Sequence, residues 1–85
     1  MTFEAAITIM PKEELLDPQG KAVQHGLHHL HLDMLHDVRV GKHITLRVDA
    51  DNEADAYERV DQACKNLLAN QIMEDYHFRL TGVDD

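Results

Sequence analysis

The sequence predicts a single α+β domain in which two helices cover one face of an antiparallel sheet. Three observations support this prediction. Short segments alternate between apolar and polar residues, two longer segments repeat apolar residues at helical spacing, and the segments follow the order β-α-β-β-α-β. The 85 residues are 44% hydrophobic and 28% charged, which is typical of a folded globular chain. We expect one domain over residues 1–85, without linkers or internal repeats.

The first predicted strand covers residues 3–9. Its apolar side chains alternate with neighbours that are mostly polar, so one face is expected to be buried and the other open. The buried set is Phe3, Ala5, Ile7 and Ile9.

The first predicted helix begins at Asp17 and Pro18 and runs to about Leu30. An aspartate at the N-cap accepts a free backbone N–H of the first turn, and proline fits the first helical position. Gly20 costs roughly 1 kcal/mol relative to alanine inside a helix, so its presence requires another explanation. The apolar stripe consists of Ala22, Val23, Gly26, Leu27 and Leu30.

Two further strands are predicted around Gly41. The apolar residues on both sides of it all have even numbers, namely Val38, Val40, Ile44, Leu46 and Val48. A three-residue loop over residues 41–43 pairs Val40 with Ile44 and keeps these side chains on one face. A single longer strand that bends at Gly41 is the alternative interpretation.

The second predicted helix covers residues 49–70, and a last strand follows it. Acidic residues crowd the first turns of the helix, where its dipole favours negative charge, and Asn70 suits its end. Its predicted buried stripe is Tyr57, Val60, Cys64, Leu67 and Leu68. In the last strand the apolar residues are Ile72, Tyr76, Phe78 and Leu80. The complete order of elements is that of the ferredoxin-like fold.

Charge and composition exclude several classes of function. The formal net charge is −8 and no basic cluster is present, which argues against nucleic-acid binding. Apolar runs are too short to span a membrane, and the N-terminal residues do not have the pattern of a signal peptide. A single cysteine excludes an internal disulfide and fits a reducing, cytoplasmic location.

No segment carries a convincing catalytic or metal site. The histidine-rich stretch "HGLHHLHLDMLH" contains His25 and His29 at a spacing that could hold a metal, but no cysteine or glutamate completes a known pattern. A solvated helix face is the favoured interpretation. Cys64 belongs to an apolar stripe and is interpreted as an inert thiol. The pair Gly20-Lys21 lacks the remainder of a phosphate-binding loop. We therefore expect no catalytic residue, metal or cofactor on this chain.

Three segments together resemble the PurS family over essentially the whole chain. They are "LDPQGKAV" at 16–23, "DVRVGKHITL" at 37–46 and "LLANQIMEDY" at 67–76. The chain departs from the usual family pattern at the end of the first helix, where His31 replaces glycine, and at Gln71, where proline is frequent. PurS is the small subunit of phosphoribosylformylglycinamidine synthase in organisms that build this purine-biosynthetic enzyme from separate chains.

The resemblance implies a subunit without catalytic residues of its own. It would form homo-oligomers, most simply dimers, that bridge a large ATP-using synthetase and a glutaminase and support ammonia transfer between them. The assembly converts formylglycinamide ribonucleotide, ATP, glutamine and water to formylglycinamidine ribonucleotide, ADP, phosphate and glutamate. ATP and Mg²⁺ are expected on the synthetase. The residues expected to contact partners are Asp17, Gln19, Gly20, Lys21, Arg39, Gly41 and Lys42.

Two other classes of function share this fold. A regulatory domain could bind a small effector at a dimer interface, although a separate chain of this length argues against it. An acylphosphatase-like enzyme would need an arginine in a glycine-rich loop after the first strand, and residues 11–20 contain none.

Overall fold

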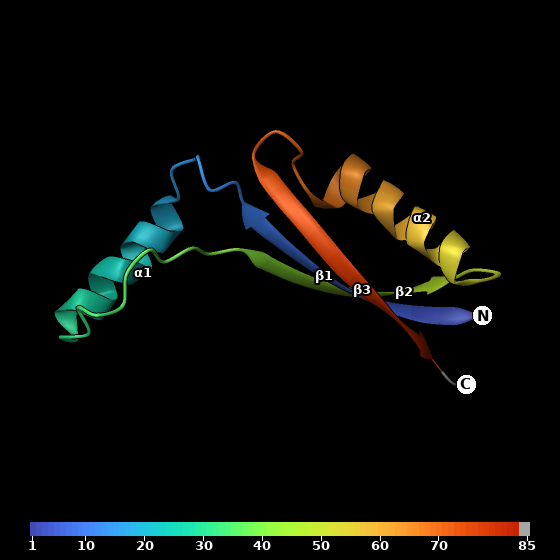
Figure 1. Cartoon of the computed structure of the whole chain (residues 1–85), viewed down its shortest axis with the longest axis horizontal. Coiled ribbons are helices and arrows are strands. Elements are labelled where there is room, and N and C mark those ends of the chain that lie inside the picture. The colour runs from blue at the N-terminus through green and yellow to red at the C-terminus, as the bar shows by residue number, and fades with distance from the viewer. Residues whose placement is uncertain (84–85) are drawn as a thin grey trace.

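The computed structural model describes residues 1–83 as a three-stranded sheet with one helix packed on it and a second helix held away from it (Figure 1). The elements are β1 (Thr2–Pro11), α1 (Pro18–His29), β2 (Lys42–Asp49), α2 (Glu53–Ala63), the π-helical turn η1 (Cys64–Leu68) and β3 (Glu74–Val83). Among residues 1–83, no helix is long and apolar enough to cross a membrane.

The sheet is antiparallel and has the order β2-β1-β3. Ile7 at the centre of β1 lies opposite Ile44 on β2 and Phe78 on β3. Since side chains alternate along a strand, this register places the apolar residues of all three strands on one face. The α+β class and the antiparallel sheet predicted from the sequence are confirmed.

The hydrophobic core lies between that face and α2 with η1. Ile7 and Ile9 are fully buried there, together with Val60 and Cys64 from the helical layer. The other face of the sheet carries polar side chains, including Arg47, and neither helix covers it (Figure 1).

The predicted hairpin over residues 41–43 is wrong, because residues 38–41 form no strand. The backbone N–H of Val40 instead donates to Asp17 Oδ2 at 2.8 Å, which directs the chain toward the start of α1. The sheet therefore has three strands, and the chain continues past Gly41 without reversing, closer to the alternative interpretation.

The prediction that both helices cover the sheet is also wrong for α1. That helix extends away from the sheet, and most of its apolar stripe, including Val23 and Leu30, is exposed (Figure 1). Helical periodicity identifies an apolar stripe that must be buried, but it does not identify the surface that buries it. We refer to residues 12–41, which contain α1, as the arm.

The second helix differs from the predicted buried stripe at two positions. Leu67 is 83% exposed and Tyr57 is 54% exposed, so neither lies in the core. The N–H of Ala69 donates to the carbonyl of Cys64 at 2.9 Å, a spacing of five residues that widens the last turn. This turn keeps Leu68 against the core while Leu67 faces solvent.

Candidate functional site at the junction of arm and sheet

The three segments that resemble the PurS family meet at one end of the sheet, where β1 ends and β3 begins. Lys42 Nζ lies 3.6 Å from Glu74 Oε2, which links the second segment to the third. Asp17 links the first segment to the second through Val40. A groove of about 310 Å³ is lined by residues of all three segments, including Gln19, Gly41 and Glu74.

Asp17 organises the start of the arm. Its Oδ1 accepts the N–H of Gly20 at 3.0 Å, which caps α1, and its Oδ2 accepts the N–H of Val40. These backbone hydrogen bonds, Gly20 first and Val40 second, lower the pKa of the Asp17 carboxyl, and the Arg39 charge contributes. Asp17 therefore serves folding of the arm at the position where a partner contact was predicted.

Gly20 is buried because the chain's own backbone approaches it. A Cβ atom at this position would overlap the carbonyl oxygen of Val38 and crowd the Asp17 carboxylate. This intramolecular contact accounts for the glycine at a position where a partner contact was predicted. Only glycine allows the first turn of α1 to lie this close to residue 38.

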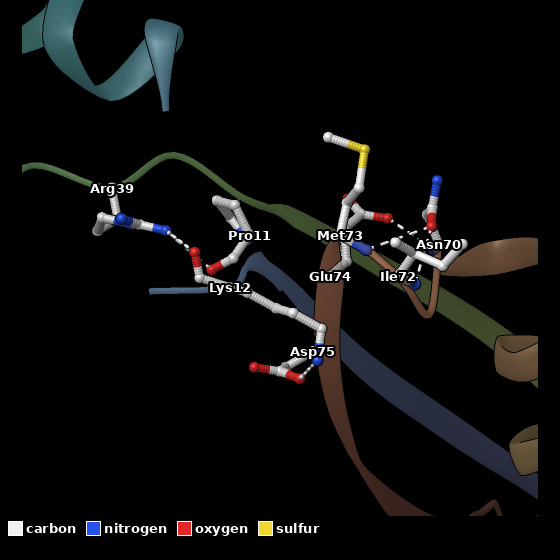
Figure 2. Close-up of polar contacts among 8 residues, drawn as sticks. All are labelled: Pro11, Lys12, Arg39, Asn70, Ile72, Met73, Glu74 and Asp75. Atoms are coloured by element: carbon white, nitrogen blue, oxygen red, sulfur yellow. Dashed lines mark hydrogen bonds and ion pairs between the residues drawn. The ribbon is translucent and has the colours of Figure 1, made fainter. Parts of the chain in front are cut away.

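Arg39 holds the connection between β1 and α1. Its Nη2 donates to the carbonyls of Pro11 at 3.0 Å and Lys12 at 2.6 Å, and its Nη1 donates to those of Glu13 at 3.3 Å and Leu15 at 3.4 Å. Figure 2 shows this guanidinium directed at the Lys12 carbonyl. A planar guanidinium suits such a set of acceptors. The guanidinium of Arg39 therefore makes its hydrogen bonds to backbone carbonyls of its own chain.

The remaining predicted contact residues are open to solvent. Gln19, Lys21, Gly41 and Lys42 are exposed. Lys21 also lines a depression of about 500 Å³ between α1 and the segment that contains Arg39. These four residues sit around the junction and face solvent.

The junction has two walls. One is the loop that follows β1, and the other is the turn over residues 70–73 before β3, which the sequence alone did not predict. Asn70 Oδ1 accepts the N–H of Ile72 at 3.0 Å and that of Met73 at 3.3 Å, while Glu74 Oε1 accepts the N–H of Asn70 at 2.8 Å (Figure 2). Ile72, predicted to lie in the last strand, is in this turn instead and is 83% exposed. The signal in the sequence was Asn70 two residues before Ile72, the spacing of an asparagine turn.

The two walls are joined by backbone and ionic contacts. The N–H of Lys12 donates to the carbonyl of Met73 at 2.9 Å, and Lys12 Nζ pairs with Asp75 Oδ1 at 3.1 Å (Figure 2). Between the walls lies a second groove, of about 270 Å³, which we call the junction groove. Its lining residues are Pro11, Leu15, Leu16, Asn70, Met73 and Glu74.

Cys64 and Tyr76 have raised pKa values and lie away from the junction groove. Within residues 1–83, no three His, Cys, Asp or Glu side chains are arranged to hold a metal ion. Cys64 is buried, and burial raises the pKa of its thiol, which disfavours the reactive thiolate. Tyr76 donates to Asp61 Oδ1 at 2.5 Å, and this hydrogen bond raises the Tyr76 pKa to about 12. That pair joins α2 to β3 and lies outside the junction groove.

The family model for PurS, described as phosphoribosylformylglycinamidine (FGAM) synthase, matches residues 4–82. The chain belongs to the PurS family. A PurS-family chain of this kind is a subunit of FGAM synthase. Two similar proteins carry the name phosphoribosylformylglycinamidine synthase subunit PurS. The one from Synechocystis is 39% identical over 98% of this chain and 83% of the relative, and the one from Bacillus subtilis is 38% identical over 95% of each.

Solved PurS structures confirm the fold. B. subtilis PurS superimposes with a TM-score of 0.83 at 36% identity, covering 94% of this chain and 99% of that one. A chain in the structure of PurLQS from Thermotoga maritima gives 0.87 at 33% identity, covering 95% and 99%. PurS from Methanocaldococcus jannaschii, with a TM-score of 0.84 at 29% identity over 96% and 99%, is described as one of the subunits of formylglycinamide ribonucleotide amidotransferase in the purine biosynthetic pathway.

Proposed function

We propose that this PurS chain is the non-catalytic bridge of the FGAM synthase complex. It holds an ATP-dependent synthetase and a glutaminase in register, so that ammonia released from glutamine reaches the synthetase before it enters bulk water. ATP and Mg²⁺ act on the synthetase, and this chain carries no cofactor. The single observation that supports this role best is the similarity to the PurS chain of PurLQS over nearly its full length. Fixed spacing of two sites supplies proximity and water exclusion rather than chemistry.

The bridge acts as a homo-oligomer, most simply a dimer. The radius of gyration is 16.6 Å, compared with about 12 Å for a compact domain of this length. This extended shape leaves Leu30 69% exposed and Met34 68% exposed on the arm, with no cover from the chain's own sheet. A second copy that covers the arm would bury these side chains.

Partners contact the open residues around the junction. Gln19, Lys21 and Lys42 are exposed at element ends, and the packing of the core does not depend on them. The complex works in the cytoplasm, which suits a chain whose only cysteine is free and buried.

Reconstitution tests the bridging role. The synthetase and glutaminase from the same source are assayed with and without this chain, using either glutamine or an ammonium salt as the nitrogen donor. We expect glutamine-dependent synthesis to require this chain and ammonium-dependent synthesis to require it much less. Equal glutamine-dependent rates with and without the chain would contradict the bridging role, whereas glutaminase activity of the isolated chain would contradict its non-catalytic character.

A further inference from the structure

The junction groove has an apolar rim that the fold does not use. Leu16 is 69% exposed and Met73 is 53% exposed on opposite walls of the groove, and Ile72 beside Met73 is 83% exposed. None of the three packs in a hydrophobic cluster of the core. Exposed aliphatic side chains grouped around a depression are typical of protein interaction sites.

The groove is formed before any partner binds. The Arg39 guanidinium fixes the loop that presents Leu16, and Asn70 fixes the turn that presents Met73. The hydrogen bond from the Lys12 N–H to the Met73 carbonyl ties the two walls together. A pre-formed groove pays little ordering entropy on binding, which favours a docking role for this part of the surface.

Charge beside the groove indicates which occupant fits. Glu13 and Glu14 directly precede the leucines of one wall, are exposed, and form no ion pair among the described residues. The neighbouring acids Glu74 and Asp75 are instead paired with Lys42 and Lys12. Two copies of this chain meeting at this groove across a two-fold axis would bring these free carboxylates together. A second copy is therefore disfavoured at this groove, although it can still bind elsewhere on the arm.

We propose that the junction groove receives an aliphatic side chain from a non-identical subunit of the synthase, surrounded on that subunit by lysine or arginine. This inference rests on the proposed bridging function and assigns one surface to it. Three exposed aliphatic residues are far fewer than the roughly 20–30 residues per side of a stable interface, so the groove anchors a larger contact. A few such anchors carry most of the binding energy of an interface.

The test compares two leucines that are equally exposed. Leu16→Lys alters the groove. Leu30→Lys alters the far end of α1, where the leucine is also 69% exposed and where a second copy is proposed to bind, so it should weaken self-association while Leu16→Lys should not. Each purified variant is tested for thermal unfolding, for oligomeric state by sedimentation, and for binding to the isolated synthetase and the isolated glutaminase. We expect Leu16→Lys to keep the fold and the oligomeric state of the unaltered chain, and to bind one of the two subunits roughly tenfold or more weakly.

Each outcome decides between the alternatives. Unchanged binding of Leu16→Lys to both subunits would overturn the proposal, and a changed oligomeric state would assign the groove to a second copy. If Leu16→Lys fails to fold, Ile72→Lys in the exposed turn takes its place under the same criteria. If the unaltered chain binds neither subunit, the bridging function itself fails, which is a different result.

A second pair of variants tests the charge argument. Glu13→Lys combined with Glu14→Lys should slow binding to that subunit at low salt, and the difference should shrink at high salt because exposed charges are screened. Glu4→Lys combined with Glu58→Lys is the control with the same change of net charge, because both glutamates are exposed and lie away from the junction groove. Binding that is unchanged by the double variant, or slowed equally by the control, would contradict a basic surrounding on the partner.

Discussion

The carbonyl oxygen of Val38 occupies the space that the Cβ atom of any other residue at position 20 would need. This contact joins the first turn of α1 to the segment that leads into β2. Glycine is unfavourable inside a helix, but the packing of the arm requires it at position 20.

Gly20→Ala should therefore destabilise the chain, by about 1–3 kcal/mol, since the overlap with Val38 must be relieved by moving backbone. Gly26→Ala is the matched control on the same helix, because a Cβ there meets nothing within 4 Å. It should stabilise the helix by roughly 1 kcal/mol. Denaturant unfolding of both variants measures the difference, and equal stabilisation by the two alanines would contradict the packing role of Gly20.

Arg39→Lys should loosen the connection between β1 and α1. A lysine ammonium lacks the planar fork that donates to four carbonyls at once, so we expect a loss of about 1–3 kcal/mol. Hydrogen exchange should rise at the residues of the loop from 12 to 15. Arg79→Lys on the open face of the sheet should change stability by less than about 0.5 kcal/mol, and a loss as large as that of Arg39→Lys would argue against a specific clamp.

The hydrogen bond from Tyr76 to Asp61 predicts a loss of stability in alkali. The folded pKa of Tyr76 is raised to about 12, above the ordinary tyrosine value of about 10. Between these two values the folded state binds more protons than the unfolded state. The stabilisation is therefore complete below about pH 10 and lost as the pH rises through 12.

Tyrosinate absorbance can follow this titration in a Tyr57→Phe variant, because the chain has only two tyrosines. Tyr76→Phe should remove the alkaline dependence and lower stability by about 1 kcal/mol. An ordinary tyrosine titration of Tyr76 in the folded chain would refute the assignment.

The end of α1 should become more stable when His31 is replaced by glycine. His31 has a φ of 63°, and the N–H of Leu32 bonds to the Leu27 carbonyl at 3.0 Å, as in a helix that ends in a left-handed residue. Relief of the left-handed conformation should contribute about 1 kcal/mol. His28→Gly, inside the same helix, should instead cost about 1 kcal/mol. A destabilising His31→Gly would show that the imidazole makes a stabilising contact.

The sequence predicted those parts of the fold in which the spacing of apolar residues along the chain indicates which side chains are buried. The alternation of Phe3, Ala5, Ile7 and Ile9 identified β1, and the even-numbered apolar residues of β2 gave its buried face. The position of α1 could not be predicted in this way, because its stripe finds no cover within residues 1–83.

The sequence predicted the candidate site as two separate segments, one around Asp17 and one around Arg39. In the structure these two segments are in contact. Resemblance pointed to the residues around Asp17 and Arg39, but only the contact of Asp17 with Val40 shows that they meet. The exposure of Leu67 depends on one widened helical turn, which a regular 3.6-residue period cannot reveal.

The central position of β1 has a consequence for synthesis. β1 precedes both of its neighbours in the chain, and β3, which completes the sheet on its other edge, follows α2. On a translating ribosome the first strand therefore emerges unpaired, and the edge that pairs with β3 stays open until residues beyond position 70 have left the exit tunnel. Closure of the core is a late, non-local event, and chaperones that hold extended apolar segments have the whole of that interval in which to bind β1.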